Sequence, residues 1–313
     1  MKKIGLLVVA CIIALVLFGC VSVKVDLGET PNTGKEFEPK TTEKPKSIST
    51  PVPTASVQHP QIEKTVIYES DIVTITVTGL EYSSIYKAYA VKVIIQNHSQ
   101  TEISYSLNWA NVNGYTIKTF TFGDVFGGME SDADFWLSCD EMSLAEIEYI
   151  QEIGFTFDIS YSDSYEQICS ASATIRTTDY GKSIETHAFD GTEIYSSEYY
   201  KIMAAPSSNP TIGHPVIIYI ENNTEQTIML MYDNVAINNK MVSDYMTGPF
   251  VLPNTKRIEP LELYYFGNEP DIDNINTVTV GFDIVPQHQE DYYSFYDNTI
   301  TVPPVTIPIG QEG

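Results

Sequence analysis

The stretch that decides the fold is "VIIQNHSQTEISYSLNWANVNGY" at residues 93–115, because it returns as "IYIENNTEQTIMLMYDNVAINNK" at residues 218–240. With the same shift of 125 positions, the two parts of the chain align without a gap from Val91 to Ile175. The matching positions include Ile95/Ile220, Asn97/Asn222, Ile103/Ile228, Asn113/Asn238, Gly123/Gly248, Phe157/Phe282, Asp158/Asp283 and Ile175/Ile300. So many matches in one register indicate two copies of one module, and copies of this length indicate tandem domains rather than a solenoid.

Each copy has the residue pattern of short β-strands. Apolar and polar residues alternate in "IVTITVTG" at 72–79 and in "YAVKVIIQN" at 89–97. A later pair, Asn113-Gly114 in the first copy and Asn238-Asn239 in the second, tolerates the positive φ angles of a tight hairpin turn. Strands of this length joined by such turns predict an antiparallel β-sandwich.

One short helix is expected in the first copy. Ser143 and Glu146 form a capping-box pattern ahead of Ile147 and Ile150. The second copy has Pro270 and Asp271 in the corresponding place, so the helix is expected to be shorter or absent there.

The amino-terminal segment predicts export and a lipid anchor. Lys2 and Lys3 precede an apolar run from Ile4 to Phe18, as in a secretory signal. "LFGC" at residues 17–20 resembles the lipobox of bacterial lipoproteins, in which Cys20 is acylated and becomes the first residue after cleavage. The alternative is an uncleaved membrane anchor, because the uncharged run is about long enough to span a bilayer.

A polar spacer and an acidic body follow the signal. Residues 21–60 are rich in Pro, Thr, Lys and Glu, which predicts an extended, disordered tether. From Gln61 onward the chain has 10 basic and 36 acidic residues, a net charge of −26. Such a body is repelled by nucleic acid and by anionic lipid headgroups, so a nucleic-acid partner is not expected.

The predicted organisation is all-β with two tandem immunoglobulin-like sandwiches. The boundaries are 1–19 for the signal peptide, 20–60 for the lipidated cysteine and linker, 61–178 for the first module and 186–309 for the second. The chain resembles surface lipoproteins of low-GC Gram-positive bacteria (Firmicutes type) with paired immunoglobulin-like modules. The resemblance rests on the Asn-loop-strand-Asn-Gly pattern and the late "FDI" strand, over residues 65–303. It implies the fold and no activity, because that family has no assigned biochemistry.

No catalytic group or cofactor site is predicted. The chain has no HExxH, no Cys pair with ligand spacing, no GxSxG and no glycine-rich phosphate loop. Acidic clusters at 132–134 and 269–273 contain oxygen ligands suited to calcium but lack the EF-hand spacing. Asp158 and Asp283 are interpreted as solvent-facing or hydrogen-bonded acids, because alternation places them opposite a core aromatic residue.

Two kinds of residue are left as candidates for a special role. Cys139 and Cys169 are either a disulfide, which an exported location permits, or two unpaired thiols. Aromatic rings on a strand face can anchor a sugar or a protein, although alternation sends half of each run into the core. The tyrosines considered for recognition are Tyr199, Tyr200, Tyr264, Tyr265, Tyr292 and Tyr293.

The sequence therefore predicts a non-enzymatic lipoprotein on the outer face of the cytoplasmic membrane. Its membrane contact is the lipid on Cys20, and its modules bind a protein or a glycan of the cell envelope. The first alternative is an accessory ectodomain of a membrane transporter or signalling complex. The second is a secreted hydrolase, which requires acids such as Asp134 and Glu148 to converge in a cleft.

Overall fold

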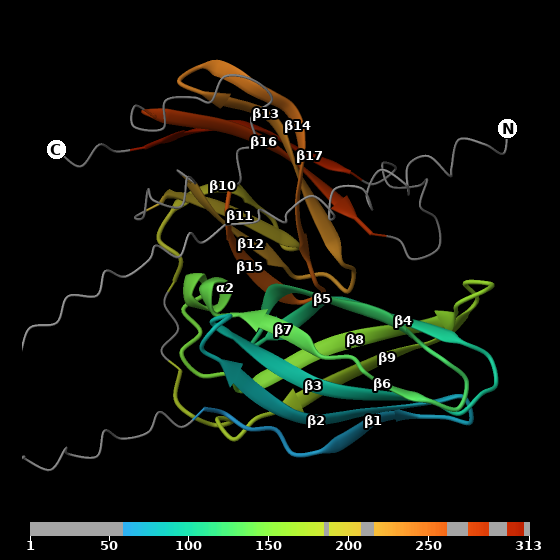
Figure 1. Cartoon of the computed structure of the whole chain (residues 1–313). Coiled ribbons are helices and arrows are strands. Elements are labelled where there is room, and N and C mark those ends of the chain that lie inside the picture. The colour runs from blue at the N-terminus through green and yellow to red at the C-terminus, as the bar shows by residue number, and fades with distance from the viewer. Residues whose placement is uncertain (1–58, 185–187, 208–215, 262–274, 288–298, 310–313) are drawn as a thin grey trace, which may run out of the picture. The chain divides into compact units, whose positions relative to one another are not determined.

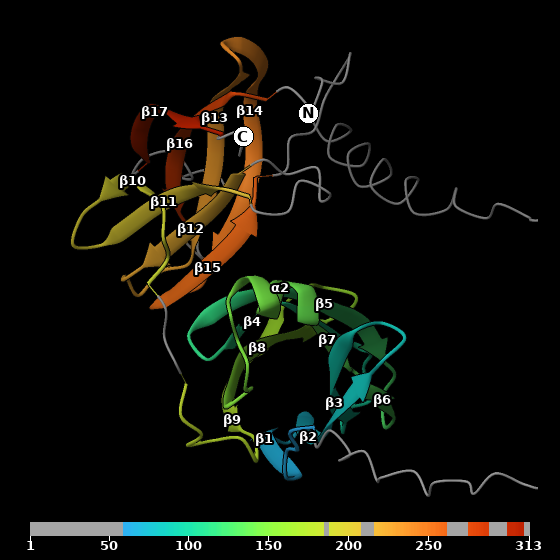
Figure 2. The ribbon, with the colours of Figure 1, turned by 90° about the vertical axis from the view of Figure 1, so that its left-hand side faces the viewer.

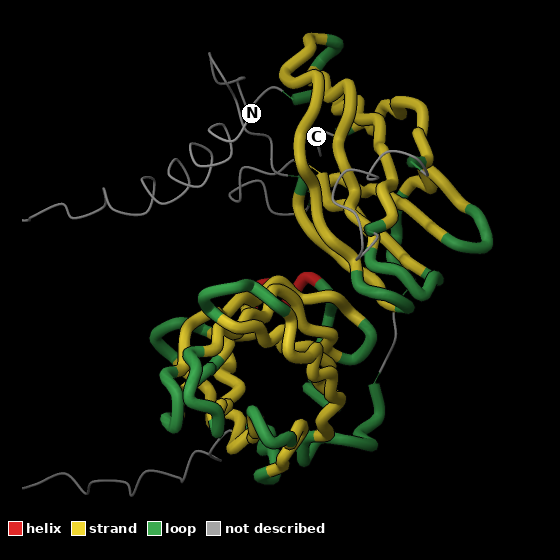
Figure 3. Tube along the Cα trace, turned by 90° about the vertical axis from the view of Figure 1, so that its right-hand side faces the viewer, coloured by secondary structure: helices red, strands yellow, loops and turns green. Residues whose placement is uncertain are grey.

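The computed structural model describes residues 59–184, 188–207, 216–261, 275–287 and 299–309 (Figure 1). Within these ranges almost every regular element is a β-strand, with a short helix, α2, between two of them (Figure 3). The strands belong to two modules, and within each module all pairing is antiparallel. This confirms the predicted all-β fold. The predicted module boundaries stay predictions.

Module 1 is a sandwich of two sheets. Its elements are β1 (Thr65–Glu69), β2 (Val73–Ser83), β3 (Ala88–Asn97), β4 (Ile103–Val112), β5 (Tyr115–Val125), β6 (Glu130–Asp132), β7 (Phe135–Ser138), α2 (Cys139–Leu144), β8 (Glu152–Tyr161) and β9 (Gln167–Arg176). One sheet has the order β1-β2-β3-β6, with β7 also beside β3, and the other has the order β5-β4-β8-β9. Figure 2 shows the two sheets curving around a common interior.

The interior of module 1 is filled by residues of alternating position on facing strands. The fully buried side chains include Ile75, Ile95, Leu107, Phe135, Phe157 and Ile159. The ring of Phe157 meets the rings of Tyr105 and Phe135 edge to face, with centroids 6.3 Å apart in each case. A buried aromatic side chain of this kind stabilises a fold by several kcal/mol, on the order of 3–5 against alanine.

Module 2 repeats this architecture. Its strands are β10 (Thr192–Ser196), β11 (Tyr200–Pro206), β12 (Val216–Asn222), β13 (Ile228–Ile237), β14 (Lys240–Val251), β15 (Thr255–Pro260), β16 (Thr277–Pro286) and β17 (Ile300–Pro308). They pair in the orders β10-β11-β12-β15 and β14-β13-β16-β17, which match the orders β1-β2-β3-β6 and β5-β4-β8-β9 of module 1. Among the described residues, module 2 has no counterpart of β7. Phe282 is fully buried, as its counterpart Phe157 is.

The two copies share the hydrogen bonds of one buried asparagine. Asn97 Nδ2 donates to the carbonyls of Thr101 and Val125, and Asn222 Nδ2 donates to those of Gln226 and Val251. In each copy the side-chain oxygen accepts from the amide two residues later, at 2.9 and 3.1 Å. The repeated asparagine therefore fixes the loop between β3 and β4 and its counterpart between β12 and β13.

A second repeated asparagine begins a hairpin turn. Asn113 has φ of 51° and Asn238 has φ of 49°, the left-handed region in which asparagine is tolerated. The following residues, Gly114 and Asn239, also have positive φ, as a type I′ turn requires. This confirms the predicted turn in both copies.

The helix lies earlier in the sequence than predicted. Ser138 caps α2 by accepting a hydrogen bond from the amide of Glu141, so the helix begins at Cys139 and ends at Leu144. The capping-box interpretation of Ser143 and Glu146 was wrong, because Ser143 lies near the end of the helix and Glu146 has φ of 54°. A serine with an acid three residues later occurs at both places, and packing selects the earlier one.

Backbone and side-chain contacts join β5 of module 1 to β15 of module 2. The two strands form a parallel bridge at Tyr115 and Lys256, and the amide of Lys256 donates to the carbonyl of Gly114 at 2.8 Å. The hydroxyls of Thr116 and Thr255 lie 2.7 Å apart, and both threonines are buried. The apolar core residues of both modules lie between Ile62 and Ile307, so this part of the chain contains its own core.

Candidate functional site

A cavity of about 400 Å³ lies beside α2 in module 1. It is called the α2 cavity below. Its lining combines apolar side chains, a thiol, a phenol and three carboxylates: Pro60, Tyr89, Cys139, Met142, Ser143, Glu146, Ile147, Glu148, Ile150 and Asp179. A concave site of this size with a few convergent polar groups is the usual form of a small-ligand pocket.

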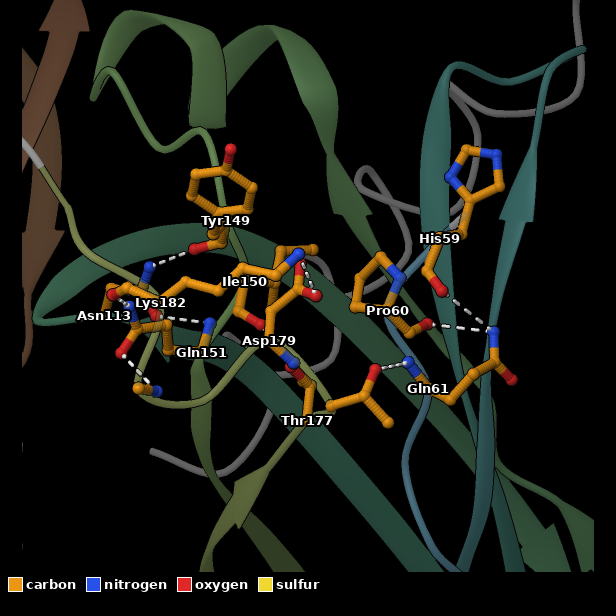
Figure 4. A network of polar contacts seen from close by, with 12 residues as sticks. His59, Pro60, Gln61, Asn113, Tyr149, Ile150, Gln151, Thr177, Asp179 and Lys182 are labelled. Atoms are coloured by element: carbon orange, nitrogen blue, oxygen red, sulfur yellow. Dashed lines mark hydrogen bonds and ion pairs between the residues drawn. The ribbon is translucent and has the colours of Figure 1, made fainter. Parts of the chain in front are cut away.

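A network of hydrogen bonds beside the α2 cavity ties the first residues of module 1 to its last ones (Figure 4). The amide of Gln61 donates to the hydroxyl of Thr178 at 3.0 Å, and the amide of Thr178 donates back to the carbonyl of Gln61 at 2.9 Å. The hydroxyl of Thr177 donates to the carbonyl of Ile150, which lines the cavity. The network thus holds chain segments far apart in sequence around one opening.

Asp179 is the carboxylate of the α2 cavity whose charge is balanced by a lysine. Its side chain is nearly buried and forms an ion pair with Lys182 at 2.7 Å. Lys182 also lies over the ring of Tyr149, with its ammonium nitrogen 4.5 Å from the ring centroid. This carboxylate is therefore held by the fold rather than free for a ligand.

Tyr89 connects the α2 cavity to an aromatic group. Its hydroxyl lies 3.1 Å from Nδ1 of His59, and the ring of His59 stacks on Tyr82 with centroids 4.3 Å apart. Burial, followed by the neighbouring Cys139 and Tyr82, raises the pKa of Tyr89. The phenol therefore stays protonated at neutral pH and acts as a hydrogen-bonding group there.

The thiol of Cys139 is a poor nucleophile. Burial raises its pKa, and the charge of Asp140 raises it further. Only the thiolate attacks, and a raised pKa lowers the fraction of thiolate at neutral pH. Cys139 is also free rather than bonded to Cys169.

Cys169 lies on β9, where its neighbour is Tyr68. Burial raises the pKa of this thiol as well. Of the two alternatives for the cysteines, the structure has the unpaired thiols.

The acids considered for hydrolysis do not converge within the described residues. Glu148 lines the α2 cavity, whereas Asp134 does not. Asp134 instead forms an ion pair with Lys92 and accepts a hydrogen bond from the amide of Val93 at 3.1 Å. The described residues also contain no group of three or more His, Cys, Asp or Glu side chains arranged for a metal.

Aromatic side chains are exposed on the adjoining strands β5 and β7, which contact each other. Phe120 and Phe122 are 65% and 69% exposed and stack on each other with centroids 5.7 Å apart. Trp136 on β7 is partly exposed and meets Tyr86 edge to face at 5.2 Å. The stacked pair Phe120 and Phe122 is called the aromatic strip below.

The aromatic strip was missed by the sequence reasoning, which weighed the tyrosine runs alone. The signal was the alternation "TFTF" at 119–122. A period of two places Thr and Phe on opposite faces but does not say which face is buried. In the structure the threonine Thr119 is buried and the phenylalanines are exposed.

A second hollow, of about 560 Å³, is polar and open. Its lining residues include Asn108, Trp109, Thr156, Asp158, Ser170, Ser172 and Thr255. Trp109 is not a free platform, because Phe250 lies against its ring with centroids 5.4 Å apart and Arg257 lies 4.9 Å from its centroid. This hollow is called the polar groove below.

The tyrosines predicted for recognition divide between surface and core. Tyr199, in the bend before β11, is 53% exposed, whereas Tyr200, the first residue of β11, is 6% exposed. Tyr264, Tyr265, Tyr292 and Tyr293 lie outside the described residues. The structure brings none of the described tyrosines of this set into the aromatic strip.

The repeated acids differ between the copies. Asp158 accepts a hydrogen bond from the hydroxyl of Ser170 and lies at the surface, as predicted. One oxygen of Asp283 is buried without a hydrogen-bond partner in the described structure. The interpretation thus holds for Asp158 alone.

The predicted lipid anchor lies outside the described residues, since Cys20 belongs to residues 1–58. Among the helices that the structure does describe, none has the length and apolar character needed to cross a bilayer. The acidic cluster at 269–273 also lies outside the described part of the chain.

Comparisons with known proteins identify no family. No family model matches the sequence, and no curated protein matches it. Among solved structures, one match is a chain of the CsuC–CsuE chaperone–tip adhesion subunit pre-assembly complex from the archaic chaperone-usher Csu pili of Acinetobacter baumannii. The identity is 10%, the match covers 69% of this chain and 90% of that chain, and the TM-score is 0.22. A TM-score this low supports no argument about function, and the fold assignment rests on the sheets themselves.

Proposed function

We propose that this chain is a non-catalytic binding or assembly protein of the cell envelope, held at the outer face of the cytoplasmic membrane by acyl chains on Cys20. The signal-like segment and "LFGC" at 17–20 support the anchor. Two or more acyl chains on Cys20 are needed, because a single acyl chain gives only marginal membrane binding.

The observation that carries the binding role is the aromatic strip. Phe120 and Phe122 leave most of their surface in water, although Thr119 on the same strand is buried. Soluble proteins rarely keep a contiguous group of large apolar side chains exposed unless it serves an interaction. Phe122 is also not required by the fold, since the sequence places Thr247 of module 2 in its position, whereas Phe120 corresponds to Tyr245.

The partner we favour is a protein with an electropositive surface. Aromatic residues are the commonest anchors of protein interfaces, and a body with a net charge of −26 attracts cationic surfaces. A glycan is the second candidate, and the polar groove favours it through its hydroxyl, amide and carboxylate side chains. If the partner is a transporter or signalling protein, the chain is its accessory ectodomain.

The aromatic strip is tested by photo-crosslinking in living cells. Phe122 is replaced by benzoylphenylalanine, and in a matched control the same group replaces Tyr165, which is 83% exposed between β8 and β9. We expect a discrete protein adduct from position 122 that weakens when Phe120→Ala is added. An equal pattern of adducts from both positions would refute the strip as a protein-binding surface.

The anchor is tested by Cys20→Ala. The variant is expected to lose incorporated palmitate and to leave the detergent phase on partitioning, because an acylated thiol supplies the apolar contact. If the variant partitions as firmly as the parent, or the mature chain still begins at Met1, the anchor is an uncleaved helix instead.

A further inference from the structure

The contact between the modules has two different sides. Module 1 contributes the β4–β5 hairpin, where the carbonyl of Gly114 accepts from the amide of Lys256 at 2.8 Å. Module 2 contributes the start of β15, where Thr255 meets Thr116 and Lys256 pairs with Tyr115. The surface of module 1 around Gly114, Tyr115 and Thr116 is called the hairpin side below. The surface of module 2 around Thr255 and Lys256 is called the turn side.

Because the modules are copies, each also carries the side that the other uses. In the hairpins, Val112 pairs with Tyr115 and Ile237 pairs with Lys240, so Lys240 and Met241 stand where module 1 has Tyr115 and Thr116. Within the described residues β14 pairs with β13 alone, so module 2 has an unused hairpin side.

Module 1 carries an unused turn side by the same reasoning. Gln96 pairs with Glu130, and its counterpart Glu221 pairs with Lys256. Met129 and Glu130 therefore stand where module 2 has Thr255 and Lys256.

The two unused sides complement each other. Met129 is 60% exposed and Met241 is 48% exposed, so an apolar pair would replace the buried Thr116–Thr255 pair. Glu130 and Lys240 are both exposed, so a pair of opposite charge would replace the Lys256–Tyr115 pair. The amide of Asn97 donates to the carbonyl of Met129, which directs the backbone of Glu130 away from β3.

We propose that the turn side of module 1 in one chain binds the hairpin side of module 2 in a second chain. Met129 then packs against Met241, Glu130 pairs with Lys240, and the amide of Glu130 donates to the carbonyl of Asn239. This inference deepens the assembly role proposed above and depends on it. The binding partner is a second copy of this chain. Its hairpin side is equivalent in position to the hairpin side of module 1, which already binds the turn side of module 2 within one chain.

The resulting assembly is heterologous. Each chain offers one turn side and one hairpin side, so chains add end to end into an open array unless the rotation closes a ring. The contact is small, and each body has a net charge of −26, so association is weak in solution and requires enough salt to screen the repulsion between the two chains. Chains confined to one membrane surface reach a far higher effective concentration, which favours the array there.

The experiment uses a fragment of residues 59–313, which contains the cores of both modules, and measures its mass by sedimentation velocity at rising concentration and at about 0.15 M salt, where repulsion between the acidic bodies is screened. The wild-type fragment is expected to grow in average mass with concentration. Glu130→Lys and Lys240→Glu are each expected to weaken this association about fivefold or more, because each places like charges across the contact. Mixing the two variants restores it, because the lysine introduced at position 130 of one chain then meets the glutamate introduced at position 240 of the other.

Matched controls and a second measurement complete the test. Lys64→Glu makes the same change in net charge as Lys240→Glu, at an exposed residue outside the contact, and is expected to leave association unchanged. Met129→Cys and Met241→Cys fragments, mixed and oxidised, are expected to give a disulfide-linked dimer, whereas Val66→Cys with Met241→Cys gives none.

Either of two results overturns the inference: a wild-type fragment that stays monomeric at every concentration, or a variant mixture no more associated than its components. The crosslink at Phe122 separates this failure from that of the proposed function. A persistent adduct at Phe122 without self-association removes the array and keeps the binding role.

Discussion

Residues that recur in both copies have their roles in local hydrogen bonding and in the core. Asn97 and Asn222 each satisfy backbone groups of a loop, and Phe157 and Phe282 each fill the centre of a sandwich. A buried carbonyl left without a donor costs about 1–3 kcal/mol, which explains why one amide side chain stands in both copies. Residues that differ between the copies, such as Phe122, are where a function can reside.

At the residue scale we predict that Cys139 is slow to alkylate. A raised pKa lowers the thiolate fraction at neutral pH, so the folded 59–313 fragment carrying Cys169→Ser should react with iodoacetamide more slowly than the same fragment in urea. The rate should climb only as the pH passes the ordinary thiol pKa of about 8.5. A folded rate at pH 7.5 equal to the unfolded rate would contradict the raised pKa.

At the scale of elements, the strands and the presence of one short helix in the first module were predictable, whereas the position of the helix was not. Strand alternation and turn asparagines are local signals, and both copies display them. The placement of α2 depends on which of two serines caps the helix, and Ser138 is fixed by the pairing of β7 with β3. The exposed face of β5 likewise depends on packing, since Thr119 and Phe120 are equally compatible with either face.

Gly248, which corresponds to Gly123 in the first copy, allows β13 and β14 to approach closely, and this gives a prediction. A Cβ at Gly248 would lie 2.5 Å from the carbonyl oxygen of Leu230, which is backbone and cannot rotate away. Gly248→Ala should therefore destabilise the 59–313 fragment by about 2 kcal/mol, the range of overpacking, measured by urea unfolding. Gly79→Ala is the matched control, because nothing lies within 4 Å of its Cβ, and it should stay within about 0.5 kcal/mol. Equal effects of the two substitutions would argue against the close approach of β13 and β14.

At the scale of the whole molecule, the modules are coupled by polar and aromatic contacts that the repeat does not reveal. Thr116 meets Thr255, and the amide of Leu252 donates to the hydroxyl of Thr116 at 3.0 Å. Glu141 lies near this contact, accepts the amide of Lys118 at 2.7 Å, and has its pKa raised by burial. Glu141 therefore takes part in the packing between the modules.

The coupling is tested by a double-mutant cycle. Thr116→Val and Thr255→Val each remove one hydroxyl of the pair, and their combination should be less destabilising than the sum of the two single changes. The expected interaction free energy is about 1 kcal/mol, the usual value for one buried hydrogen bond. Thr156→Val with Thr255→Val is the control, since Thr156 bonds to Ser172 instead, and its two effects should add. Additive effects in the test pair would mean that the hydroxyls do not interact in solution.

The sequence by itself determined the duplication, the β-sandwich class and the turns. These follow from a fixed register of matches, a period of two, and asparagines that bond to their own neighbourhood, all of which are properties of short segments. Only the tertiary structure decided which face of β5 is exposed, which serine caps the helix, that two thiols stay apart, and which edges of the copies meet. Those outcomes depend on contacts between residues distant in sequence, whose free energy no local pattern contains.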